Sequence, residues 1–68
     1  MSRRELLELP PSVDLVTAGR ALGIGRTKAY ELARAEDFPA RVLRLGNTYR
    51  VVTADLLRLL GVEEDNAA

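Results

Sequence analysis

The sequence lacks the two residues that most often do chemistry in proteins: it has 68 residues, with no cysteine and no histidine. Without cysteine it can form neither a disulfide nor a thiolate metal site. Without histidine it lacks the commonest metal ligand and general base. The acidic residues show no pairing typical of a catalytic cleft. We therefore expect no enzymatic activity, no metal and no other cofactor.

Long apolar runs are missing as well. No stretch approaches the roughly 20 apolar residues that a membrane helix needs. The start, Met-Ser-Arg-Arg-Glu-Leu-Leu-Glu, lacks the apolar core of a signal peptide. We expect a cytoplasmic protein without membrane contact. Its length predicts one domain over 1–68, with an N-terminal arm (1–11), a disordered acidic tail (62–68) and too little core for a small-molecule ligand pocket.

Net charge is also absent, because ten basic residues balance ten acidic ones. The charges are unevenly placed, however. Residues 20–58 hold eight basic and four acidic side chains, whereas 59–68 hold three acidic and no basic ones. Charges farther away than a Debye length, about 8 Å at physiological salt, are largely screened. A basic centre between acidic ends is therefore compatible with a nucleic-acid partner.

What is present is a pattern of two short helices joined by a tight turn. Thr17 is expected to cap the first helix, which runs to about Leu22, and Gly23 suits the left-handed conformation that ends a helix. The second helix is expected over 26–35. Its apolar residues recur at helical spacing and predict a buried stripe, formed by Ala29, Leu32 and Ala33. Two such helices form a helix-turn-helix.

The opposite face of the second helix carries the candidate DNA contacts: Arg26, Thr27, Lys28, Tyr30 and Arg34. Arginine in the major groove most often pairs with guanine. Tyr30 either hydrogen-bonds a phosphate or packs against the rest of the fold. Glu31 either contacts a base, holds a neighbouring cation or is solvated. Arg20, on the first helix, is a candidate phosphate contact or a solvated charge.

A β-hairpin is expected over 41–52, around Gly46-Asn47. A two-residue loop would mix apolar and charged residues on both faces. A three-residue loop would place Arg44 directly opposite Arg50 and gather Leu43, Leu45, Tyr49 and Val51 on one face, so it is the register that we expect. Two opposed arginines repel, which favours an anion over them. The hairpin candidates for DNA binding are Arg44, Asn47, Thr48 and Arg50.

Each end of the domain carries leucines beside a helix signal. Ser2 and Glu5 form a capping-box pattern, so a short helix is expected before Pro10-Pro11. Thr53 is expected to cap a last helix that is apolar nearly all round and ends at Gly61. The leucines of either end can cover the core or can receive another subunit or a partner protein.

The order of these features resembles a known family. Ala21-Leu22-Gly23-Ile24-Gly25-Arg26-Thr27, then Phe38-Pro39, Arg44-Leu45-Gly46, Tyr49-Arg50 and Asp55-Leu56 look like the MerR-like winged helix-turn-helix of excisionases and AlpA-type prophage regulators. The resemblance covers roughly residues 13–61. It implies an α+β fold: helices with a two-stranded β-hairpin wing. Gly25 departs from the pattern, which usually has serine or threonine as the cap.

The resemblance also implies a function. Excisionases, or recombination directionality factors, bind and bend attachment-site DNA cooperatively and direct an integrase toward excision. The partners implied here are duplex DNA, an integrase and further copies of the chain, in the cytoplasm of a bacterium. The alternatives are a small transcription regulator with the same DNA-binding chemistry and, from another class, a protein-interaction module that uses the leucine-bearing ends.

Overall fold

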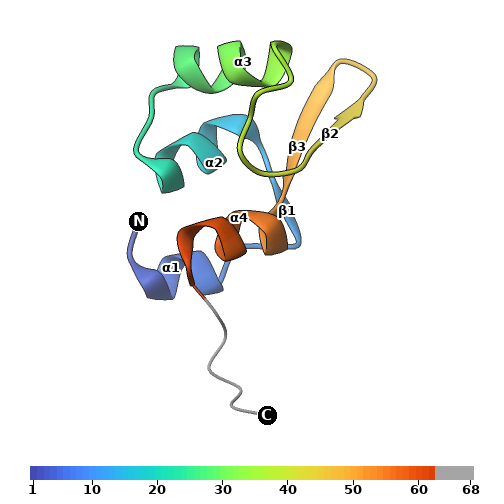
Figure 1. The fold of residues 1–68 in the computed structure, drawn as a ribbon. Coiled ribbons are helices and arrows are strands. Elements are labelled where there is room, and N and C mark those ends of the chain that lie inside the picture. Colours follow the sequence, from blue (N-terminus) through green and yellow to red (C-terminus); the bar gives the residue numbers. More distant parts are fainter. Residues whose placement is uncertain (63–68) are drawn as a thin grey trace.

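The computed structural model describes residues 1–62 and shows a small α+β fold, with four helices and a three-stranded antiparallel sheet among these residues (Figure 1). The elements are α1 (Arg3–Leu7), β1 (Ser12–Val13), α2 (Leu15–Leu22), α3 (Arg26–Arg34), β2 (Val42–Leu45), β3 (Thr48–Val52) and α4 (Thr53–Leu60). The expected disordered tail lies, except for Val62, outside the described residues. No helix in residues 1–62 has both the length and the apolar character that crossing a membrane requires.

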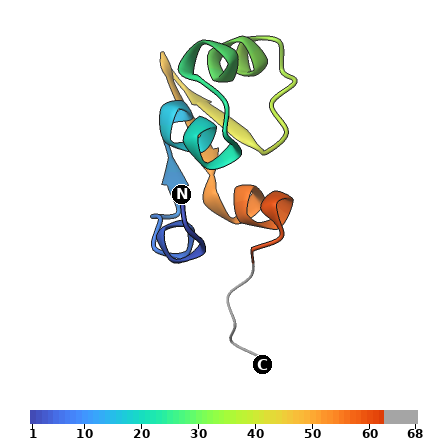
Figure 2. The same cartoon turned by 90° about the vertical axis from the view of Figure 1, so that its left-hand side faces the viewer.

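The elements divide the molecule into two ends. Helix α3 and the tip of the β2–β3 hairpin lie at one end, while α1 and α4 lie at the other (Figures 1 and 2). Helix α2 lies between them and packs against both α3 and β3. The two-helix unit that the sequence predicted therefore stands beside the hairpin.

The sheet has one strand more than expected and a different register. β3 is the middle strand, in the order β1-β3-β2. Leu45 pairs with Thr48, Arg44 with Tyr49 and Leu43 with Arg50, so the loop has two residues and the expected three-residue loop is wrong. Gly46 has a φ of 65°, as the first central residue of a type II′ hairpin turn does, and that turn fits the twist of the strands.

The expectation failed because it required the whole hairpin to cover the core. Only its base does: Val42 lies opposite Val51, and Val51 is fully buried. Toward the tip the same face carries Arg44, which is exposed, opposite Tyr49, which is half-buried at the edge of the core. Leu45, expected in the core, is 62% exposed on the other face. Both faces of the hairpin carry apolar and charged residues because the hairpin projects beyond the core.

The core is small and rich in alanine. Its largest fully buried side chains are Leu15, Val51 and Leu56. Ala29 and Ala33 bury the predicted stripe of α3, with Leu32 half-buried beside them, and Phe38 packs against this core from the loop that follows. Small side chains let α2 and α3 approach closely: a Cβ on Gly19 would lie 3.3 Å from the Ala29 Cβ and 3.2 Å from the Ile24 carbonyl oxygen.

Two of the expected helix caps are different residues in the structure. Helix α2 begins at Leu15, and the cap is Asp14, whose Oδ1 accepts from the Thr17 N–H at 2.8 Å. Thr17 therefore lies inside the helix that it was expected to cap. Thr53 is the first residue of α4, and its buried hydroxyl donates to the Pro10 carbonyl oxygen. The expected Ser2–Glu5 capping box is confirmed.

Three helices end in the same backbone arrangement, in which two consecutive N–H groups bond back to the last turn. After α2 and α4 the left-handed residue is a glycine, Gly23 or Gly61, with φ of 78° and 73°. After α3 it is Glu36, with φ of 58°. A side chain there costs on the order of 1 kcal/mol, which glycine avoids. Glu36 is the only non-glycine residue with positive φ among the described residues.

We predict that Gly19→Val lowers the free energy of unfolding by about 1–3 kcal/mol, because the added atoms must enter the close contact between α2 and α3. Urea denaturation followed by circular dichroism measures the change. Gly25→Ser is the control, since a Cβ at Gly25 meets nothing within 4 Å and serine supplies a cap oxygen for α3. It should be neutral or stabilising by a few tenths of a kcal/mol. Equal losses in both variants would contradict the packing argument.

We predict that the stability of the fold in acid depends on Asp14. The Asp14 pKa is lowered, chiefly by hydrogen bonding from the Thr17 side chain and then from its backbone N–H. A lowered folded pKa stabilises the fold above the unfolded pKa of about 4, and this contribution disappears as the pH falls toward the folded pKa. Asp14→Asn should therefore flatten the fall of the urea midpoint between about pH 5 and pH 2. An unchanged slope would show that Asp14 contributes nothing to acid unfolding.

Candidate nucleic-acid interface

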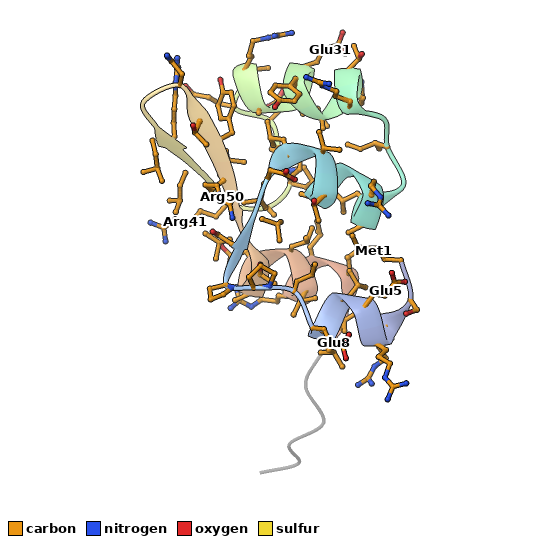
Figure 3. The ribbon with its side chains drawn as sticks, turned by 180° about the vertical axis from the view of Figure 1, so that it is seen from behind. Met1, Glu5, Glu8, Glu31, Arg41 and Arg50 are labelled. Carbon is orange, nitrogen blue, oxygen red and sulfur yellow. The ribbon has the colours of Figure 1, made fainter. Side chains whose placement is uncertain are left out.

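Helix α3 presents a largely polar face to solvent. Its cap, Gly25, has extended backbone angles but no side chain to bond the first N–H groups. The exposed residues are Arg26, Thr27, Lys28, Glu31 and Arg34, while Tyr30 is half-buried. Figure 3 shows Glu31 at the outer side of this helix, away from Arg41 and Arg50 near the hairpin base. The first-turn N–H groups, the helix dipole and the exposed cations all favour an anion at the N-terminus of α3.

Two tyrosines join α3 to the hairpin. The rings of Tyr30 and Tyr49 meet edge to face, with centroids 6.1 Å apart and an angle of 78° between their planes. The Arg26 guanidinium lies 5.8 Å from the Tyr30 ring centroid, and that of Arg44 lies 5.6 Å from the Tyr49 centroid. We call these four residues the Arg–Tyr stack. Tyr30 thus packs against the hairpin, one of the two alternatives that its sequence position left open.

The arginines of the stack are held without being neutralised. The side chains of four cations, two of them outside the stack, form no ion pair or hydrogen bond with another residue of the described chain: Arg26, Lys28, Arg34 and Arg44. Cation–π contact restricts a guanidinium but leaves its N–H donors available. These charges can therefore bind an anion without breaking an existing salt bridge.

Arg50 differs from the other candidates. Its Nε donates to the Ser12 Oγ at 3.2 Å and its Nη2 to the Ser12 carbonyl oxygen at 2.9 Å. It lies opposite Leu43, on the face of the sheet away from Arg44. The expected pair of opposed arginines does not exist, so the repulsion argument for an anion over them is wrong. The guanidinium instead ties β3 to β1, and a β1 strand was not part of the prediction.

The remaining candidates lie apart from the stack. Asn47 and Thr48 are exposed at the hairpin tip. Arg20 is exposed in the last turn of α2. The pKa of Glu5 is lowered, mainly by hydrogen bonds with Ser2 and more weakly by the charge of Arg20. Arg20 therefore acts electrostatically on α1, at the end of the molecule that lies away from the hairpin tip.

A metal site finds no support in residues 1–62. No group of three or more acidic, histidine or cysteine residues there is placed to hold a metal ion. Comparisons of the chain with protein-family models, curated proteins and solved structures gave no match. The likeness to excisionases therefore depends on the sequence pattern alone.

Sequence reasoning missed two parts of this surface. Tyr49 was expected only to cover the core, but it connects the hairpin to α3. Glu36, just after the expected second helix, has no expected role in the sequence, yet it lines a groove with Arg34 and Arg44. A two-residue hairpin loop would have revealed the first, because it makes Arg44 and Tyr49 direct neighbours. No sequence signal marks the second.

We predict that Arg50→Gln lowers the free energy of unfolding by about 1–2 kcal/mol, because it removes two charge-assisted hydrogen bonds to Ser12. Arg44→Gln should cost less than about 0.5 kcal/mol, since this arginine has only its ring contact to lose. Urea midpoints of the two variants give the comparison. Equal stability of both would show that the Ser12 contacts contribute nothing.

Proposed function

We propose that the protein binds duplex DNA as a winged helix-turn-helix. Helices α2 and α3 form the helix-turn-helix, α3 enters the major groove, and the β2–β3 hairpin acts as the wing along the neighbouring backbone. The observation that carries the proposal is the Arg–Tyr stack, because it fixes the exposed face of α3 and the hairpin in one arrangement, with a free arginine at each side.

The dimensions of α3 agree with this proposal. A nine-residue helix is about 14 Å long, and the major groove, about 12 Å wide, admits a helix. Arg26 and Arg34 stand two turns apart on the exposed side. In the proposed complex Arg26, Lys28 and Arg34 approach base edges and phosphates, and Arg44 approaches the backbone beside them. Arg50 positions the wing through β1.

Within DNA-binding proteins, we propose an architectural role like that of the excisionases: several copies load on adjacent sites, bend the DNA and assist an integrase. Support for this finer role comes from the resemblance stated above and from the leucines left exposed. Leu45 on the hairpin and Leu59 on α4 are 62% and 47% exposed, and both are available for contact between copies. The alternative is a small transcription regulator, which the same DNA-binding surface suits equally.

The test is a fluorescence-anisotropy titration of a random-sequence duplex of about 50 base pairs, repeated across a salt series. Four free cations predict a slope of log affinity against log salt of about −4 per bound copy. Arg44→Gln should lower the slope by about one unit. Arg41→Gln is the matched control, because Arg41 lies at the hairpin base beside α4; it should leave the slope nearly unchanged.

The outcomes separate the alternatives. A steep slope with cooperative loading, and direct repeats in selected sites, supports the excisionase role. A steep slope with dimers on inverted repeats supports a regulator. No binding at low salt contradicts the DNA proposal and leaves the leucine-bearing ends as protein-interaction surfaces. Equal losses from Arg41→Gln and Arg44→Gln would show that net charge alone drives binding.

A further inference from the structure

A groove runs between the C-terminal end of α3 and the face of the hairpin that carries Tyr49. Its volume is about 390 Å³. Residues from α3, the following loop and both hairpin strands line it: Ala33, Arg34, Glu36, Phe38, Ala40, Val42, Arg44 and Tyr49. It lies beside the Arg–Tyr stack, to which Tyr49 and Arg44 also belong.

The chemistry of this groove combines apolar and cationic surface. Phe38, Ala40 and Val42 supply apolar atoms, whereas Arg34 and Arg44 supply two guanidinium groups from different elements. Neither guanidinium is paired with an acidic residue of the described chain. A sugar–phosphate unit has the matching character, because the deoxyribose packs on apolar surface and the phosphate accepts from the arginines.

The position of the groove fits the same ligand. In duplex DNA a sugar–phosphate strand separates the major groove from the neighbouring minor groove. If α3 occupies the major groove and the hairpin follows the adjacent backbone, the strand between them faces the gap between the two elements. That gap is this groove, and its cationic side chains come one from each element.

Glu36 is the residue that does not fit. It is the one acidic residue that lines the groove, together with Arg34 and Arg44, yet it is no ion-pair partner of either one. It also occupies the left-handed position that two other helix ends fill with glycine. Backbone strain of this kind is found preferentially at functional sites. Because Glu36 lowers stability and repels an anion in the groove, we expect it to affect the affinity for that anion.

We propose that the groove binds one backbone phosphate and its sugar, and that Glu36 sets the affinity by competing with that phosphate for Arg34 and Arg44. The inference depends on the proposed DNA binding and deepens it. Without Glu36, each copy would bind any duplex more tightly. With it, a single copy binds weakly, and stable occupancy requires further contacts on the DNA.

The test compares Glu36→Gln with Asp37→Asn in the anisotropy titration. Glu36→Gln removes the charge and keeps the backbone conformation, and it should raise the affinity for every duplex roughly three- to tenfold. Asp37 is exposed, carries the same charge and does not line the groove. Asp37→Asn should change the affinity by less than about twofold. The urea midpoint should stay constant in both variants.

A double variant isolates the competition. In an Arg44→Gln background, Glu36→Gln should gain markedly less than it does with Arg44 present, because one of the contested cations is gone. A third variant, Glu36→Gly, should raise affinity as Gln does and also raise the urea midpoint, since glycine relieves the left-handed strain.

Failure of this inference is distinguishable from failure of DNA binding. If the unaltered protein binds no duplex, the proposed function falls. If it binds but Glu36→Gln equals the unaltered protein or Asp37→Asn, or if its gain persists undiminished with Arg44→Gln, the phosphate groove is refuted. Inorganic phosphate titrated at constant ionic strength is the last arm. Saturable binding below about 1 mM, sensitive to Glu36→Gln, would show that the groove takes free phosphate and would overturn its assignment to the DNA backbone.

Discussion

The register of strand β3 is the constraint on which the rest of this small structure depends. Val51 is fully buried and pairs with Val42 on one side and Val13 on the other. Every position along β3 is then fixed, because a shift of one residue would turn each side chain to the opposite face. Tyr49 therefore lies on the face toward α3, and Arg50 on the face where Ser12 can accept from its guanidinium. This single pairing therefore makes Arg50 a structural residue and leaves Arg44 exposed to solvent.

The same register explains how a domain with a small alanine-rich core can hold a projecting hairpin. Only the hairpin base rests on the core. Its outer part is held by the edge-to-face contact between Tyr30 and Tyr49, a kind of pair that contributes about 0.5–1.5 kcal/mol beyond the area it buries. The cation–π contacts of Arg26 and Arg44 extend this link across α3 and β2. The tyrosine rings thus fix the angle between α3 and the hairpin. The guanidinium groups that contact these rings keep charged donors on the surface that we propose to face DNA.

Local signals predicted the parts of the fold that depend on local physics. The C-terminal end of α2 at Leu22, the start of α3 at Arg26, the left-handed Gly23 and the Ser2–Glu5 capping box were all correct, because backbone hydrogen bonding within a few residues decides them. One error is local, because Asp14 and not Thr17 caps α2. The others concern contacts between distant segments. Pro10 accepts from Thr53, so the cap assigned to Thr53 is wrong. Arg50 lies opposite Leu43 and donates to Ser12, so the expected pairing of Arg44 with Arg50 is wrong as well. The two-residue hairpin loop was rejected on the premise that a whole face must be apolar, which ignored where the core ends.

Acidic side chains partly balance the basic ones near the surface that we propose to bind DNA. Four cations are proposed to meet DNA: Arg26, Lys28, Arg34 and Arg44. The same part of the sequence carries Glu31, Glu36 and Asp37, so its excess of positive charge is small. Long-range attraction to a duplex is correspondingly weak. Discrimination must then come from short-range contacts, in which a guanidinium donates directly to a phosphate or a guanine. In the proposed complex a protein with such a surface binds stably where several copies fit side by side on the DNA, and it does not coat DNA of any sequence.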